Sequence, residues 1–354
     1  MKIIDSFGLN SKFIIFTNHY SLFSRKIQIL HQTENTNYKS NNILKKRLLI
    51  ILKIITSISI IYFLINFIEF DKIRAAIGKA DFLLILFAIL LLPLNLFWQF
   101  KKWELVCNTM LKTDGKRKIL FSLFYGISGG IITPLQAGEY VTRAIPFKDS
   151  SFLKIAIATA VDKLFPLLIV SFAGSIMAIP FLHYYFGISK TITVLGLIVI
   201  LSLFSLLFLI IFKKGILKNK FVRKIENVKI LKTFINELKE VKKLSRTFSI
   251  KMSIFSLLLI LTFSFQYVLL TSAFTHNFEL LNYLWFVLMV LFVKTILPPI
   301  TFGEIGIREA ASVYLGSYFG ISQVAAFNAA LILFLINLVL PSLFGLLLFM
   351  VKPE

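Results

Sequence analysis

The sequence predicts an all-α, polytopic integral membrane protein of about eight helices, two of them re-entrant or broken and arranged in an inverted repeat. Three observations support this prediction. Hydrophobic side chains make up 57% of the 354 residues and charged ones 16%, whereas a soluble domain carries about 25% charged residues. Long apolar runs recur along the chain after residue 47. A motif of Pro, Gly, Glu and Arg occurs twice, 165 residues apart.

Eight apolar segments are predicted to be helices, because a spanning helix needs about 20 apolar residues and the runs lack the alternation of a lipid-embedded barrel. They are residues 48–68, 82–100, 119–133, 152–182, 191–212, 252–275, 280–298 and 322–350. Segment 119–133 is short and rich in glycine, and segment 152–182 is interrupted by Asp162, Lys163 and Pro166. We therefore expect both to be broken or re-entrant helices.

The formal charge of +22 is concentrated in loops on one predicted side of the membrane. The segments rich in Lys and Arg are residues 1–47, 101–118 and 213–251, which carry eight, six and thirteen of these residues. The segments poor in Lys and Arg are residues 69–81, 183–190 and 276–279, which carry three, one and none of these residues. By the positive-inside rule the rich set and the N-terminus are cytoplasmic. The charge is then a topology signal, and we expect no nucleic-acid partner.

The same pattern predicts four parts of the chain. They are a basic cytoplasmic N-terminal arm (1–47), a first membrane half (48–212), a basic amphipathic cytoplasmic linker (213–251) and a second membrane half (252–354). The single cysteine, Cys107, excludes an intramolecular disulfide, and the four histidines lack metal-ligand spacing. No Walker A pattern occurs, so we expect neither a metal nor another cofactor.

The internal repeat places charged residues next to apolar segments. Residues 134–143 read PLQAGEYVTR and residues 299–308 read PITFGEIGIR, so both fit P-x-x-x-G-E-x-x-x-R. Segment 119–133 is predicted to run outward and segment 280–298 inward, so the two motifs enter the membrane from opposite faces. Many secondary transporters have such inverted repeats, in which interrupted helices meet at the repeat interface.

The residue types of the motif suit a helix break beside a polar cavity. Pro and Gly are expected to end one helix and start another at Pro134, Gly138, Pro299 and Gly303. Irregular backbone at membrane depth is tolerated where it is buried in protein or lines a wet cavity.

The charged residues of the motif are the predicted site. Glu139 and Glu304 would lie in the first turn of the new helix, and Arg143 and Arg308 would follow at i+4 on the same face. We expect the two arginines to bind an anionic headgroup and the glutamates to orient them. The alternative is that each Glu–Arg pair only neutralises itself at the helix break. Further candidates for substrate binding are Glu309, Asp162 and Lys163.

Around these residues the chain resembles the lysylphosphatidylglycerol synthase transmembrane, or flippase-like, family. The resemblance covers roughly residues 48–350 and rests on Thr133-Pro134, Gly138-Glu139, Arg143, Asp162-Lys163, and Pro299 with Gly303 to Glu309. The family implies a multi-pass protein of the bacterial cytoplasmic (inner) membrane. Its best-understood members join a flippase region to a soluble aminoacyl-transferase domain. The chain ends at Glu354, so we expect it to lack that transferase.

The predicted function is translocation of a lipid, rather than catalysis. A phospholipid or polyprenyl-phosphate headgroup would enter a cavity between the two halves while its tails stay in the bilayer. One alternative is an intramembrane transferase acting on lipid-linked substrates, with Glu139, Asp162 or Glu304 as base. Another is a membrane scaffold for a separately encoded aminoacyl-transferase. A homo-oligomer and a separate enzyme partner both stay open at this point.

Overall fold

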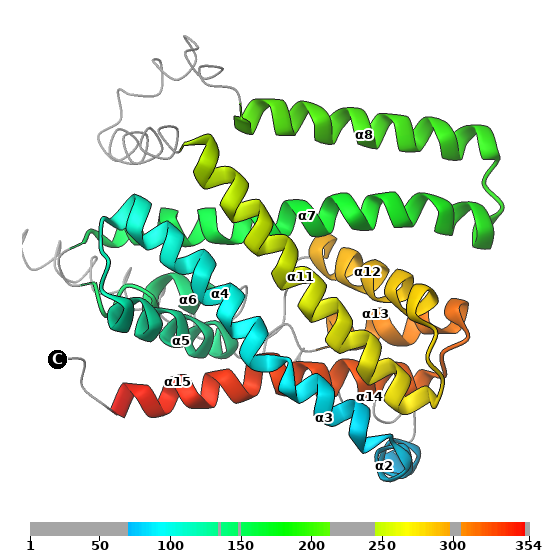
Figure 1. Ribbon diagram of the computed structural model, residues 1–354. Coiled ribbons are helices and arrows are strands. Elements are labelled where there is room, and N and C mark those ends of the chain that lie inside the picture. The colour runs from blue at the N-terminus through cyan, green and yellow to red at the C-terminus, as the bar shows by residue number, and fades with distance from the viewer. Residues whose placement is uncertain (1–69, 134–135, 148–149, 213–244, 298–305, 351–354) are drawn as a thin grey trace, which may run out of the picture. The chain divides into compact units, whose positions relative to one another are not determined.

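The computed structural model describes residues 70–133, 136–147, 150–212, 245–297 and 306–350, and within these ranges it contains helices and no strand. The helices are α2 (Phe70–Lys79), α3 (Phe82–Leu90), α4 (Leu92–Val106), α5 (Lys116–Ile132), α6 (Ala137–Thr142), α7 (Phe152–Phe186), α8 (Lys190–Phe212), α11 (Arg246–Thr275), α12 (Leu280–Ile296), α13 (Ile307–Gly316), α14 (Gln323–Phe334) and α15 (Leu340–Met350). The all-α prediction is confirmed, and each predicted helix within the described ranges is present (Figure 1).

Some predictions fall on residues outside those ranges. They concern the N-terminal arm, the helix predicted at 48–68, and most of the linker predicted at 213–251. Within the last of these segments, α11 already begins at Arg246.

Four helical segments are long and apolar enough to cross a membrane. They are Phe82–Leu111, Phe152–Phe186, Arg246–Thr275 and Gln323–Leu348. The first continues α3 and α4 into a π-helical turn, and the last joins α14 to α15 through another π-helical turn at Leu335–Val339. Helix α12 is apolar but shorter. The chain is therefore a multi-pass membrane protein.

Local sequence signals set where the long helices begin and end. Side-chain oxygens accept backbone N–H groups at four helix starts, namely Asp81 for α3, Ser151 for α7, Ser245 for α11 and Ser322 for α14. Such caps satisfy amide groups that have no partner within the helix. Helices α7 and α11 end at residues in the left-handed conformation, Gly187 (φ 67°) and His276 (φ 56°).

The expected interruption of segment 152–182 is wrong, because α7 is one continuous helix of 35 residues that contains Pro166. Proline is tolerated in membrane helices where neighbouring groups satisfy the freed backbone carbonyl. Asp162 and Lys163 also require no break, because each pairs with side chains from other elements.

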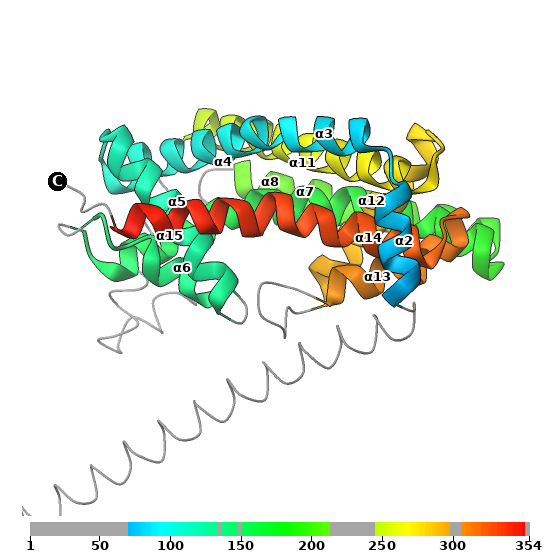
Figure 2. The same cartoon turned by 90° about the horizontal axis from the view of Figure 1, so that it is seen from below.

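Two short helical hairpins enter the bundle from opposite ends. Helices α5 and α12 have 17 residues each, or about 26 Å, which is shorter than the roughly 30 Å hydrocarbon core. Each packs against the next short helix, α6 or α13. In Figures 1 and 2, α5 and α6 lie at one end of the helix bundle and α12 and α13 at the other. The first hairpin begins with segment 119–133, one of the two segments predicted to be re-entrant or broken, whereas the second begins with segment 280–298 and not with segment 152–182.

Each hairpin packs against a long helix from the other part of the chain. Helix α12 contacts α7, and α5 contacts α15. A Cβ at Gly174 of α7 would lie 2.3 Å from the Cβ of Phe292, and one at Gly345 of α15 would lie 2.2 Å from the Oγ of Ser128. Small residues permit such close helix packing in membranes, where lipid removes most of the hydrophobic driving force.

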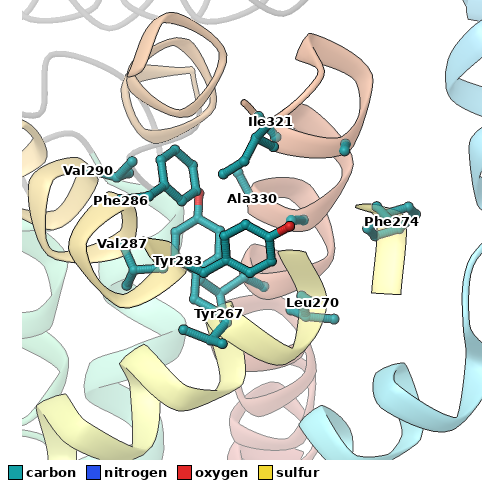
Figure 3. Close-up of a cluster of buried hydrophobic side chains, with 14 of the residues drawn as sticks. Tyr267, Leu270, Phe274, Tyr283, Phe286, Val287, Val290, Ile321 and Ala330 are labelled. Atoms are coloured by element: carbon teal, nitrogen blue, oxygen red, sulfur yellow. The ribbon is translucent and has the colours of Figure 1, made fainter. Parts of the chain in front are cut away.

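The largest apolar core joins α11, α12 and α14. Figure 3 shows Tyr267 and Leu270 of α11 beside Phe286 and Val287 of α12, with Ala330 of α14 adjacent. These side chains are all buried. The core fixes α12, which is the first helix of the α12–α13 hairpin, relative to α11.

The first hairpin depends on direct backbone contact between α5 and α6. Its turn contains Gln136 in the left-handed conformation (φ 52°), while the preceding Pro134 lies outside the described residues. The backbone N–H of Gly138 donates to the Oγ1 of Thr133 at 2.6 Å. A Cβ at Gly138 would lie 2.2 Å from the carbonyl oxygen of Gly129 on α5. Gly138 is therefore needed for close packing of the two helices.

We predict that Gly138→Ala destabilises the protein, because the added methyl group must push α6 away from α5. Overpacking of this kind costs about 1–3 kcal/mol. The melting temperature of the purified protein in detergent should fall, with a lower yield of monodisperse material. Gly78→Ala is the control, because a Cβ there meets nothing within 4 Å. Equal melting temperatures for the two variants would contradict the packing argument.

Candidate functional site

A cavity of about 330 Å³ lies between the hairpins and the long helices. Its walls come from α4, α5, α6, α7, α11, α12, α13 and the π-helical turn at 335–339. Arg143 and Arg308, the two arginines of the sequence repeat, both line it. The structure thus brings together side chains that are 165 residues apart in sequence.

The other predicted site residues divide into four groups. Glu139, Asp162 and Lys163 line the cavity. Glu309 is fully buried but is not among the lining residues. Pro134, Pro299, Gly303 and Glu304 lie outside the described ranges, and Gly138 lies at the contact between α5 and α6 and does not line the cavity.

Arg143 is held between two carboxylates. Its Nη2 lies 2.6 Å from the Oε1 of Glu139, one helical turn earlier, and its Nη1 lies 3.0 Å from the Oδ2 of Asp162 on α7. All three side chains are at least nine-tenths buried. The i, i+4 pairing predicted for Glu139 and Arg143 is present. Both Nη atoms of Arg143 are thus engaged, and its Nε has no hydrogen-bond partner among the described residues.

Two lysines complete this ion cluster. Lys102 Nζ of α4 lies 3.3 Å from the Oδ1 of Asp162, and Lys163 Nζ lies 2.5 Å from the Oε2 of Glu139. Lys163 Nζ also donates to the Oε1 of Gln136 at 2.6 Å. Although Asp162 and Lys163 are adjacent in sequence, each pairs with a different element. The cluster therefore ties α4, α6 and α7 together.

The main chain and the guanidinium plane of Arg143 are also fixed. Ser122 Oγ donates to the carbonyl oxygen of Arg143 at 2.8 Å and accepts from Trp103 Nε1 at 3.2 Å. The indole ring of Trp103 lies 4.2 Å from the guanidinium carbon, a favourable cation–π distance. Arg143 is thus a rigid part of the wall.

Among the described residues, Arg308 has one carboxylate partner, whereas Arg143 has two. The Arg308 side chain is 0% exposed, and its Nη2 donates to the Oε1 of Glu309 at 3.2 Å. The Nε and Nη1 atoms have no hydrogen-bond partner among the described residues. An unpaired buried donor costs about 1–3 kcal/mol, and more for a charged group. Arg308 therefore has unused capacity to donate to a ligand in the cavity.

Glu309 positions the start of α13. Its Oε2 accepts a hydrogen bond from the backbone N–H of Gly306 at 2.7 Å. Gly306 has a φ of 98°, a backbone conformation that favours glycine. Ser312 Oγ donates to the carbonyl oxygen of Arg308 at 2.7 Å and bonds the hydroxyl of Tyr267. The arrangement is similar at Arg143, where Ser122 bonds the arginine carbonyl oxygen and Trp103 bonds the serine.

Sequence reasoning missed a polar row on α4. Asn95, Gln99 and Lys102 follow at i, i+4 and i+7, so they share one helix face, and all three line the cavity. The spacing was visible in the sequence, but Lys102 was attributed to a cytoplasmic loop and the two amides to an apolar run. Asn337, in the π-helical turn, and Lys294 of α12 are further lining residues.

The lining carries more positive than negative charge. Five lining residues are basic, namely Lys102, Arg143, Lys163, Lys294 and Arg308, and two are acidic, Glu139 and Asp162. When Glu309, which pairs with Arg308 but does not line the cavity, is counted as well, the described charged groups carry a formal excess of two positive charges. In a low-dielectric setting this excess favours an anionic ligand.

Comparison with known protein families identifies the class of membrane domain. The model described as "Lysylphosphatidylglycerol synthase TM region" matches residues 50–345. This range includes every described residue that lines the cavity. No curated protein and no solved structure matches the chain.

We predict that Asp162→Asn strongly destabilises the protein, because it leaves Lys102 and Arg143 buried with one counter-charge fewer. Breaking a buried ion pair costs about 3–5 kcal/mol. Glu104→Gln is the matched control, since it removes a carboxylate whose partner, Lys101, is 35% exposed and should cost about 1 kcal/mol or less. Thermal melting in detergent or nanodiscs measures both. Similar melting temperatures for the two variants would show that the cluster is not structural.

Proposed function

The chain belongs to the lysylphosphatidylglycerol synthase transmembrane-region family, and we propose that it is a lipid translocase that carries a lipid with an anionic headgroup. The observation that carries this proposal is the positively charged cavity, in which two guanidinium nitrogens of Arg308 have no partner among the described residues. Ionisable residues within a membrane region are expensive to maintain and usually mark a transport path or a site. The headgroup would occupy the cavity while the lipid tails remain in the bilayer.

A phosphate is the headgroup component that Arg308 suits best. Guanidinium groups donate two parallel hydrogen bonds to phosphate oxygens, and such charge-assisted bonds are the stronger class. The two nitrogens without a partner among the described residues, Nε and Nη1, lie on different edges of the planar group, so each can donate a charge-assisted hydrogen bond to a phosphate oxygen. Phospholipids and polyprenyl phosphates both present this chemistry. Arg143, whose charge two carboxylates already balance, instead holds the wall in place.

The two hairpins support a transport cycle with alternating access. They enter from opposite ends of the bundle, and each packs on a long helix of the other half. Inverted halves of this kind can rock against each other around a central site. We infer that the halves are related by an inverted repeat and that the cavity opens alternately to each leaflet.

The positions of the connecting loops support the predicted orientation. In Figure 1 the α4–α5 connection lies at one end of the bundle, whereas the α7–α8 and α11–α12 connections lie at the other. The first of these loops is rich in Lys and Arg and the other two are poor. By the positive-inside rule we propose a bacterial cytoplasmic membrane protein with a cytoplasmic N-terminus.

The ion cluster argues against the intramembrane transferase. A general base must be able to accept a proton from its substrate. Among the described candidates, Glu139 is bound by Arg143 and Lys163, and Asp162 by Arg143 and Lys102. Both carboxylates are thus engaged with cations rather than poised for proton abstraction.

We predict that Arg308→Gln reduces lipid translocation roughly 10- to 100-fold, because it removes one or two charge-assisted hydrogen bonds. The assay is headgroup quenching of fluorescent phospholipids and polyprenyl phosphates in proteoliposomes. Arg308→Gln also leaves the buried Glu309 without its described counter-charge, so its melting temperature should fall and the transport rate is expressed per folded protein. Arg143→Gln should lower the melting temperature as well, because Arg143 balances two buried carboxylates.

Arg117→Gln is the control for a change of arginine elsewhere. Arg117 lies on the exposed start of α5, where its guanidinium group contacts the ring of Phe121. The transport rate of the Arg117→Gln variant should equal that of wild type. Wild-type rates no higher than those of empty vesicles, for every anionic lipid tried, would refute the translocase.

A further inference from the structure

A second, outer cavity of about 320 Å³ lies between α4 and α11. None of the residues that line it also lines the central cavity described above. We propose that the outer cavity binds the headgroup of an anionic phospholipid as a lipid site separate from the transport path. The lipid belongs to the leaflet at the Lys- and Arg-rich end of the bundle. The inference goes beyond the proposed function, because it holds whether or not the chain translocates lipid.

The two cavities lie against different faces of α4. Trp98, Lys101 and Leu105 follow at i, i+3 and i+7 and line the outer cavity. Asn95 and Gln99, on another face, line the central cavity. Helices α4 and α11 pack against each other, and Figure 1 shows the end of α4 and the start of α11 at the same end of the bundle. Helix α4 therefore presents one polar face to each cavity.

Two lysines place the outer cavity at the depth of lipid headgroups. Lys101 follows the apolar run of residues 82–100, and Lys251 precedes the apolar run of residues 252–275. Both lysines line the outer cavity. A lysine at the end of a spanning segment extends its ammonium group toward the membrane interface. The outer cavity thus lies where the hydrocarbon core meets the headgroup layer.

The charges of the outer cavity favour an anion. Lys101 Nζ lies 2.8 Å from the Oε2 of Glu104, whereas Lys251 is exposed and has no ion pair among the described residues. The described lining contains these two lysines and one glutamate, which gives a formal excess of one positive charge. A phospholipid with a single negative charge balances this excess, and a zwitterionic one does not. Lys251 is the expected phosphate ligand.

The apolar wall of the outer cavity continues into surface that faces lipid. The rings of Trp98 and Phe255 stack across the contact between α4 and α11, with 6.2 Å between their centroids. One turn deeper on each helix, Leu94 is exposed and Leu258 is half-buried. An apolar surface below a cation suits an acyl chain below a phosphate. A soluble anion would use the cation alone, so the arrangement favours a lipid.

The simplest alternative is that these residues are ordinary interfacial anchors. Lysine and tryptophan are common at membrane interfaces, where they contact whichever lipid is adjacent. The outer cavity differs in two respects. Its volume of about 320 Å³ falls within the roughly 300–1,000 Å³ of small-molecule pockets. One wall is also held in place, because Lys101 is bound by Glu104 and lies 5.8 Å from the centre of the Phe97 ring. A built site predicts saturable and selective binding.

The test measures quenching of Trp98 fluorescence by phospholipids with brominated acyl chains, added to the full chain in detergent. Trp98 lines the outer cavity, whereas Trp103 is buried and Trp285 lies on α12. Brominated phosphatidylglycerol should quench saturably. Its affinity should exceed that of brominated phosphatidylcholine about fivefold, as expected for one charge near the membrane surface. The Trp98→Phe variant should show no saturable quenching.

Lys251→Gln should weaken phosphatidylglycerol binding about fivefold and remove the preference over phosphatidylcholine. Lys251→Arg keeps the charge and should keep the preference. Lys118→Gln is the matched control, because Lys118 is an exposed lysine at the start of α5 that does not line the outer cavity. It should bind both lipids as wild type does. Lys251 is itself exposed, so its replacement should leave the fold intact.

The outcomes separate the outer site from the central cavity. Non-saturable quenching, equal affinities for the two lipids, or a preference that persists in Lys251→Gln would overturn the outer site and leave translocation untouched. Loss of saturable quenching in folded Arg308→Gln would assign the bound lipid to the central cavity instead. Displacement of the lipid by inorganic phosphate at the same concentration would assign the outer cavity to a soluble anion.

Discussion

The need to pair buried charge organises the centre of this protein. An isolated ion in a low-dielectric interior costs several kcal/mol, so buried charges persist where counter-charges and hydrogen bonds surround them. Asp162 meets this requirement by pairing with Lys102 and Arg143, and Glu139 by pairing with Arg143 and Lys163. These contacts join α4, α6 and α7, and α4 and α7 also share an apolar core with α5. The position of the first hairpin therefore depends on electrostatic pairing as well as on packing.

The same requirement explains which parts of the fold the sequence could predict. Apolar run length is a local property, and it located each long helix in the described ranges. The partners of a buried charge are not local. Asp162 and Lys163 suggested a break in α7 because their partners, Lys102 and Glu139, are distant in sequence. With those partners in place, the helix continues without interruption.

The repeat predicted the two arginines of the site but not the difference between them. Arg143 and Arg308 occupy identical motif positions and line the same cavity. Arg143 obtains its second carboxylate from Asp162 on α7, outside the motif, whereas the described partner of Arg308 is the adjacent Glu309. A motif reports which groups are present, and the surrounding helices determine how far each is neutralised. The polar row on α4 was missed for a related reason, since two amides in an apolar run look like ordinary interhelical contacts.

Partial neutralisation is what a translocase requires of its anion site. A fully unpaired guanidinium group at membrane depth would bind a phosphate too strongly to release it, and one held by two carboxylates, as Arg143 is, would bind it too weakly. Glu309 lies 3.2 Å from Arg308 Nη2 and so competes with the substrate phosphate proposed here, while Nε and Nη1 remain to attract it. When the substrate leaves, Glu309 still compensates part of the charge. In the proposed transport cycle, this partial compensation would let the cavity return without a ligand, which a site that depended on its ligand for neutrality could not do.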